Sequence, residues 1–218
     1  MQLPVVLMAL AVVFDLSHTP ASFAAPGASP VVPADDYALY DQAVTRKFLT
    51  DQTQLVLVER ATTTSISPRQ AEPLSVRWFE EEQYFDGTLP ADLVCGFIAA
   101  NQTPSRLEGR FGFGVRYRFV SGETIEEPEV SLARPLPVSS GWPAQWGPVL
   151  DRLVFSRIGY DRAQRHALLY VGNPRPDGTG AGFLVWFRRQ EAGWGIWDTE
   201  VIWTVHIQPE SDGPLLAP

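Results

Sequence analysis

The sequence predicts an α+β fold: a curved antiparallel sheet that ends in a C-terminal meander, with two main helices packed against it. The first observation is that residues 151–206 contain four short runs rich in β-branched and aromatic residues, separated by turn-forming residues. These expected strands are residues 153–158, 166–171, 183–187 and 194–205. Strands joined by short loops pair with their sequence neighbours, so the four are expected to form an antiparallel meander.

The second observation is that two upstream segments carry apolar residues at helical spacing. Residues 35–50 begin with a possible cap at Asp35 or Asp36, and residues 88–101 begin with Thr88 as the expected cap. The apolar stripe of the first helix is Tyr37, Tyr40, Val44 and Phe48. That of the second is Leu93, Val94, Phe97 and Ile98, and Cys95 beside it is expected to be a small buried side chain.

The remaining elements follow in chain order. Residues 55–58 predict a first strand and residues 110–120 predict a strand or two, whereas residues 77–85 fit a helix or a strand equally well. The acidic, proline-broken residues 123–137 predict a loop. Because the helices precede the meander rather than alternate with strands, the order favours α+β over α/β. An all-β, barrel-like sheet with peripheral helices is the alternative fold.

The last hairpin of the meander has a predictable register. With its turn centred between Glu191 and Ala192, Phe187 is expected to face Ile196, and Trp186 to face Trp197. Alternation then leaves both faces of the hairpin largely apolar, so the sheet is expected to be covered on both sides or strongly curved. A β-bulge near Asp198 would exchange the two faces beyond it.

The N-terminus predicts export. Residues 3–14 form an apolar run that is short of the roughly 20 residues needed to span a bilayer. The small residues Ser22 and Ala24 then form a cleavage site, so residues 1–24 are expected to be a signal peptide, although no basic residue precedes Arg46. We expect a periplasmic or extracellular protein without a transmembrane span after cleavage. Residues 25–34 predict a flexible spacer, residues 35–208 one domain and residues 209–218 a tail.

Composition excludes several classes of function. The chain has 25 acidic and 17 basic residues and a net charge of −8. An acidic protein repels the phosphate backbone, so nucleic-acid binding is not expected. A single cysteine rules out an intramolecular disulfide bond. The sequence contains no His-Glu-x-x-His motif and no Asp-x-Asp loop, so neither a metal site nor a cofactor is expected.

Several short segments resemble an uncharacterised family of secreted bacterial proteins with no established activity. The matching segments are residues 156–160, 167–173, 180–182 and 193–196, together with Trp203. Upstream, Tyr37 and Tyr40 are similar as well. The resemblance implies export and a single fold across most of the chain, and it transfers no catalytic residue.

A hydrolytic site can be assembled from the meander. With a turn near Asp161, Ser156 is expected to lie across from His166, and Asp198 or Glu200 would orient the imidazole ring. The segment lacks the sharp strand-to-helix turn that commonly positions a nucleophile, and a cross-strand Ser–His pair is usually structural. A pair of acidic residues is a second route to hydrolysis, and the clusters are Glu80, Glu81 and Glu82, then Glu126, Glu127 and Glu129. Adjacent glutamates are more often a solvated surface.

The aromatic residues suggest binding rather than catalysis. Trp186, Trp197 and Trp203 are expected on one face of the sheet, where they would form a stacking platform or lie in the core under the helices. The sequence therefore predicts an exported, non-catalytic domain that binds a small molecule, a glycan or a protein partner. The alternative is a hydrolase that uses Ser156 with His166, or an acidic pair.

Overall fold

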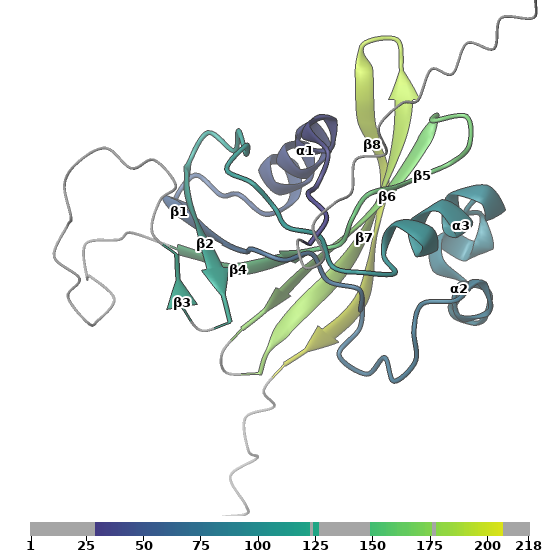
Figure 1. Cartoon of the computed structure of the whole chain (residues 1–218), viewed down its shortest axis with the longest axis horizontal. Helices are drawn as coiled ribbons and strands as arrows, with labels where there is room; N and C mark the ends of the chain where they lie inside the picture. Colours follow the sequence, from purple (N-terminus) through teal and green to yellow (C-terminus); the bar gives the residue numbers. More distant parts are fainter. Residues whose placement is uncertain (1–28, 123, 127–148, 176–177, 207–218) are drawn as a thin grey trace, which may run out of the picture.

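The computed structural model describes residues 29–122, 124–126, 149–175 and 178–206 (Figure 1). The expected signal peptide, most of the acidic loop and the C-terminal tail lie outside these ranges. Inside them, the amide of Val32 donates to the carbonyl of Arg106 at 3.1 Å, and the amide of Arg106 donates to the carbonyl of Pro30 at 2.7 Å. Val32 is also buried. The packed part of the chain therefore begins before residue 35, within the predicted spacer.

One mixed sheet of eight strands forms the centre of the fold. Its strands are β1 (Leu55–Glu59), β2 (Arg116–Ser121), β3 (Thr124–Ile125), β4 (Val149–Phe155), β5 (Gly159–Tyr160), β6 (His166–Pro174), β7 (Gly180–Gln190) and β8 (Gly193–Val205). The order is β3-β2-β1-β4-β6-β7-β8, and β5 pairs with β6 beside this path. The α+β class and the C-terminal meander are therefore confirmed, and the described strands form an open sheet rather than a closed barrel.

The prediction of a wholly antiparallel sheet is wrong. β1 is parallel to both β2 and β4, whereas the pairs β2–β3, β4–β6, β5–β6, β6–β7 and β7–β8 are antiparallel. Parallel neighbours require a long crossover connection. Residues 60–115, which include two helices, provide that connection between β1 and β2. Strand periodicity is the same in both kinds of pair, so it carries no information about strand direction.

Helices cover both faces of the sheet (Figure 1). The helices are α1 (Tyr37–Lys47), α2 (Val76–Glu82) and α3 (Ala91–Ala100), with short 3₁₀ turns η1 (Ala34–Asp36) and η2 (Tyr84–Gly87). α1 packs with Leu169, Val185 and Phe187. α2 and α3 pack with Leu168, Leu184 and Trp186, which alternate with the first set along β6 and β7. The expectation that the sheet is covered on both sides is therefore confirmed.

α2 is the element that the sequence left open between helix and strand. The side chain of Ser75 caps it by accepting a hydrogen bond from the amide of Trp78 at 3.2 Å. Phe79 is its buried residue, and Gln83 ends it in the left-handed conformation. The sequence signal for this helix was Ser75, which can cap a helix that contains Trp78. The run of glutamates at residues 80–82 made that signal hard to recognise.

Two glycines set the contact between α3 and β5. A Cβ on Gly96 would lie well inside 3.0 Å of the carbonyl oxygen of Tyr160, and one on Gly159 would lie as close to the backbone of Phe97. The side chain of Asn101 then joins the end of α3 to Arg157, accepting from its amide at 2.7 Å and donating to its carbonyl at 3.0 Å.

The residues at the starts of the two predicted helices do not cap them with their side chains, and Cys95 is not buried as expected. α3 begins after Pro90, and the hydroxyl of Thr88 donates to the carbonyl of Phe85 at 2.7 Å instead of capping the helix. Asp36 precedes α1, but its carboxylate accepts from the hydroxyl of Tyr160 at 2.8 Å. Burial raises the pKa of Asp36, because the charged form loses its hydration. Cys95 is exposed, since it lies on the side of α3 opposite the sheet.

The β7–β8 hairpin contains two bulges. Phe187 pairs with Ile196 and Gln190 pairs with Gly193, as the turn position predicts. Trp186 pairs with Asp198 instead of Trp197, because Trp197 is the extra residue of the first bulge. A second bulge lies between Val201 and Trp203, which pair with Phe183 and Gly182. The bulge that the sequence left open near Asp198 is therefore present.

A candidate binding pocket between α2 and α3

The structure does not bring Ser156 and His166 together. Ser156 lies opposite Tyr170: its amide donates to the carbonyl of Tyr170 at 3.0 Å, and its hydroxyl accepts from the amide of Tyr170 at 2.9 Å. The predicted register is wrong because the turn is centred between residues 163 and 164, about two residues later than expected. The carboxylate of Asp161 accepts from the amides of Arg165 and His166 at 2.6 and 2.9 Å, so four residues lie between β5 and β6 beyond Asp161.

The other members of the hydrolytic hypothesis also have separate roles. His166 accepts at Nδ1 from the indole N–H of Trp186 at 3.2 Å. Asp198 is exposed, and its carboxylate accepts from the amide of Thr199 at 2.7 Å. The carboxylate of Glu200 accepts from the amide of Phe85 in η2. Each group bonds to a different neighbour, so the described residues show no hydrogen-bonded triad among these four side chains.

The three tryptophans do not form a common platform. Trp186 is buried, and its ring lies 5.6 Å from that of Phe85. Trp203 is half-buried and donates from its indole nitrogen to the carbonyl of Ile66 and the hydroxyl of Tyr170, both at 3.1 Å. Trp197 is 55% exposed. Trp197 is the extra residue of the first bulge, and the guanidinium of Arg188 lies 4.6 Å from the centre of its ring. The three rings therefore differ in burial and in partners, and none stacks on another.

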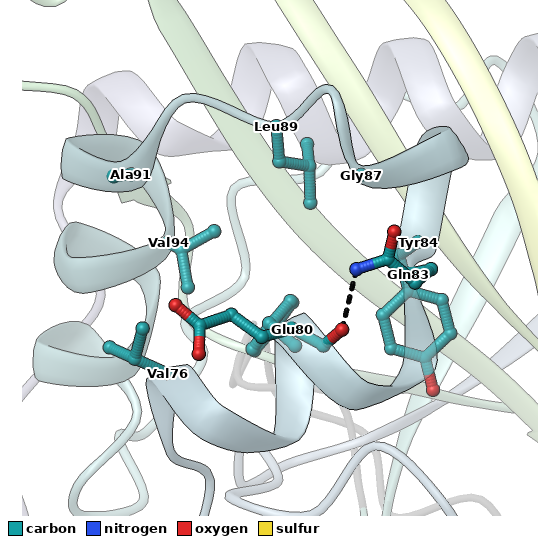
Figure 2. A pocket seen from close by; sticks show the side chains of 9 residues that line it. Val76, Glu80, Gln83, Tyr84, Gly87, Leu89, Ala91 and Val94 are labelled. Carbon is teal, nitrogen blue, oxygen red and sulfur yellow. Dashed lines mark hydrogen bonds between the residues drawn. The ribbon is translucent and has the colours of Figure 1, made fainter.

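A pocket of about 190 Å³ lies where α2, η2 and the start of α3 meet (Figure 2). Its lining is Val76, Phe79, Glu80, Gln83, Tyr84, Gly87, Leu89, Ala91 and Val94. Figure 2 shows Leu89 and Val94 directed toward the side of α2 that carries Val76 and Glu80. The pocket is mostly apolar, and Glu80, Gln83 and Tyr84 are the lining residues that carry polar side-chain groups.

One wall of the pocket is a strained backbone segment. Gln83, Phe85 and Asp86 have φ angles of 53°, 54° and 54°, in the left-handed region that non-glycine residues seldom occupy. Each such residue costs about 1–3 kcal/mol and persists only where its surroundings hold it. Gly87 continues the segment with a φ of 69°. Backbone strain of this kind clusters at binding and switch sites.

Contacts from the sheet hold this segment in place. Glu200 of β8 accepts from the amide of Phe85, whose ring lies against Trp186 of β7. Within the segment, the amide of Gly87 donates to the carbonyl of Gln83 at 3.0 Å. The side-chain amide of Gln83 donates to the carbonyl of Glu80 at 2.6 Å, which fixes the polar side of the pocket (Figure 2). The pocket is therefore built before any ligand arrives.

The charges around the pocket are acidic. Glu80 is exposed and Glu81 pairs with Arg77 at 2.6 Å, one helical turn earlier. Burial, together with the carboxylates of Glu82 and Glu200, raises the pKa of Tyr84, so its phenol, which is neutral at physiological pH in any case, also stays neutral at higher pH. The pocket therefore offers an apolar surface, a neutral phenol and one carboxylate.

Glu200 supports the pocket through a single interaction that a variant can remove. We expect Glu200→Ala to lower the free energy of unfolding by about 1–3 kcal/mol, because the amide of Phe85 loses its acceptor in a strained turn. Denaturant unfolding measures this change. Asp198→Ala is the matched control on the same strand, and it should cost less than about 0.5 kcal/mol because Asp198 is exposed. Equal costs for the two variants would contradict the assigned role of Glu200.

The described part of the chain holds no group of three or more His, Cys, Asp or Glu side chains placed to bind a metal ion. Within the same residues, every helix is too short or too polar to cross a bilayer. Sequence reasoning missed the pocket because its lining comes from a helix that was not assigned and from a turn with unusual φ angles. Glu80 was noticed only as a member of an acidic cluster.

Comparison with known proteins gives the pocket no counterpart. No family model matches the chain, and neither a curated protein nor a solved structure matches it. The resemblance to secreted bacterial proteins stays a prediction.

Proposed function

We propose that this protein is an exported, non-catalytic binding domain whose pocket between α2 and α3 takes one apolar group that carries a cationic neighbour. The observation that carries the proposal is the preformed pocket of about 190 Å³, walled by a left-handed segment that Glu200 holds. Export is proposed from the N-terminal sequence.

The size of the pocket limits what it holds. Sites for drug-sized ligands measure about 300–1,000 Å³, whereas an apolar cavity of about 150 Å³ accepts benzene. A volume of about 190 Å³ therefore suits one aromatic ring or one branched aliphatic group. Such a group is supplied by a small molecule or by one side chain of a protein partner. Interfaces commonly bury an anchor side chain in a pocket of this kind.

The lining favours an amine over a carboxylate or a sugar. The carboxylate of Glu80 is the only charged group among the residues of the pocket, so it attracts a cation and repels an anion. A sugar presents many hydroxyl groups that need hydrogen-bonding partners, and a mostly apolar lining supplies few of them. Binding of a glycan, which the tryptophans suggested, is therefore the weakest of the three binding hypotheses.

Benzylamine is the probe that tests this proposal. We expect saturable binding with a dissociation constant on the order of 1 mM, which corresponds to about 4 kcal/mol, or about 0.5 kcal/mol for each of the eight heavy atoms, well below the ceiling of about 1.5 kcal/mol per heavy atom for small ligands. Benzoate should bind at least about tenfold more weakly, because its carboxylate and that of Glu80 are both negatively charged and repel each other. Titration followed by protein NMR shifts measures both affinities and shows whether the shifted residues surround the pocket.

Paired variants make the result specific. Ala91→Trp fills the mouth of the pocket from an exposed position and should abolish benzylamine binding, whereas Ala99→Trp, exposed on the same helix, should leave it unchanged. Glu80→Gln should remove the preference for the amine, and Glu82→Gln should retain it. If benzylamine does not saturate by about 10 mM, or if Ala91→Trp binds it normally, the proposal is wrong.

A further inference from the structure

β8 is a long open edge of the sheet. It ends the strand order, so β7 pairs with one of its sides and no described strand pairs with the other. The opposite edge is β3, which has two residues, whereas β8 has 13. Lysine and proline commonly protect a long edge, and Gly193–Val205 contains neither, although it carries two carboxylates, Asp198 and Glu200, and two bulges. A long open strand of this kind presents backbone amides and carbonyls that favour pairing with another strand.

The exposed apolar side chains gather on the same strand. Five large hydrophobic residues are exposed in the described part of the chain, and three of them belong to β8. These three are Trp197, Val201 and Val205, which are 55%, 53% and 38% exposed. Val201 lies midway between the other two in sequence. Val201, opposite Phe183, and Val205, opposite Gly180, lie on different faces of the sheet, so the symmetry of the spacing runs along the strand, and a second antiparallel copy of β8 matches it.

We propose that β8 pairs antiparallel with β8 of a second copy, with the two-fold axis at Val201, so that the sheet continues from one molecule into the next. A two-fold contact of this type uses the same surface on both molecules. Val201 then faces Val201 of the second copy. The apolar residues toward the two ends of the strand meet in pairs, Trp197 with Val205 and Val205 with Trp197.

The two bulges preserve this symmetry. Val201 lies opposite Phe183 of β7. Three positions along β7 in one direction is Trp186, which pairs with Asp198. Three positions in the other direction is Gly180, which pairs with Val205. One extra residue stands in each half of the strand, namely Trp197 and Ile202, so both halves are shortened equally. Paired residues therefore fall on the same face of the extended sheet, and Trp197 with Asp198 meets Val205 of the second copy.

Charge supports this axis over its neighbours. An axis at Asp198 or at Glu200 would place each carboxylate against its own copy, and an axis at Thr199 would place Asp198 against Glu200. Like charges directly opposite each other destabilise a strand pair. With the axis at Val201, Glu200 lies opposite Trp203 and no two carboxylates are opposed. The apolar spacing and the charges therefore favour the same register.

Cysteine cross-linking tests the register. Cys95 is exposed, so the variants are made with Cys95→Ser. Val201→Cys should form a disulfide-linked dimer under mild oxidation, because residues facing each other across antiparallel strands have Cα atoms about 4.5–5.5 Å apart. Thr199→Cys is the control: the two copies of Thr199 would be four positions apart along the strand, roughly 13 Å, which is too far for a disulfide bond.

Sedimentation equilibrium of the purified protein tests the association itself. We expect a monomer–dimer equilibrium whose dissociation constant rises at least about tenfold in Val201→Lys, because two lysines would face each other across the axis. Val31→Lys is the matched control, since Val31 is 48% exposed and lies outside β8. A monomer at all concentrations, a dimer unaffected by Val201→Lys, or equal cross-linking at positions 199 and 201 overturns the proposal. None of these outcomes bears on the binding of benzylamine.

Discussion

Gly159→Ala is expected to lower the free energy of unfolding by about 3 kcal/mol or more, which corresponds to roughly 6–12 °C in melting temperature for a domain of this size. The added Cβ would overlap the backbone of Phe97 in α3. A helix backbone has no rotamer through which to yield, so α3 must move away from β5. That movement opens the core around Phe97, which is fully buried.

Two further glycine variants make this result diagnostic. Gly96→Ala should cost about as much as Gly159→Ala, because its Cβ would overlap the carbonyl of Tyr160. The double variant should cost less than the sum, since one displacement of α3 relieves both overlaps. Gly112→Ala is the control: its Cβ meets only the carboxylate of Asp41 at 3.1 Å, and that side chain can move. Urea unfolding that places Gly159→Ala within about 1 kcal/mol of the unsubstituted protein would contradict this packing.

Phe155→Ala is expected to cost about 3–5 kcal/mol, the range for removing a fully buried aromatic ring. Phe155 has no exposed surface, and its ring lies 5.0 Å from that of Tyr40 in α1 and 5.9 Å from that of Phe111. Loss of the ring leaves a cavity between α1 and the sheet, with side chains from three separate segments around it. Chemical denaturation measures the change.

Phe183→Ala provides the comparison. Phe183 is half-buried and its ring contacts that of Phe48 at 5.2 Å, so its removal opens a space that water can fill. We expect it to cost at least about 1 kcal/mol less than Phe155→Ala. If the two variants are equally stable, Phe155 is not central to the core beneath α1.

Local patterns predicted much of the secondary structure. The alternation of residues 183–187 and 194–205 and the turn between Glu191 and Ala192 gave the correct strands and the correct Phe187–Ile196 pair. The stripes around Tyr40 and Phe97 gave the correct helices. These predictions succeed because the periods of 3.6 and 2 residues depend only on neighbours in sequence.

Other features were predicted wrongly or not at all. The parallel pairing of β1 with β2 and β4 depends on how residues 60–115 cross the sheet, and strand periodicity does not encode it. The register of Ser156 depended on where one turn is centred, and the hydrogen bonds from the amides of Arg165 and His166 to the carboxylate of Asp161 lie in that turn. The candidate site was missed because left-handed φ angles at Gln83, Phe85 and Asp86 have no sequence signature.

The sequence by itself determined the α+β class, the two main helices and the C-terminal meander, because each is encoded by residues close together along the chain. Only the tertiary structure decided which strands run parallel, where Trp197 leaves the alternation of its strand, and that a pocket forms beside α2. Glu200 and Phe85, whose hydrogen bond supports the pocket, are 115 positions apart in sequence. A contact of that range depends on the packing of the whole sheet, so no local pattern predicts it.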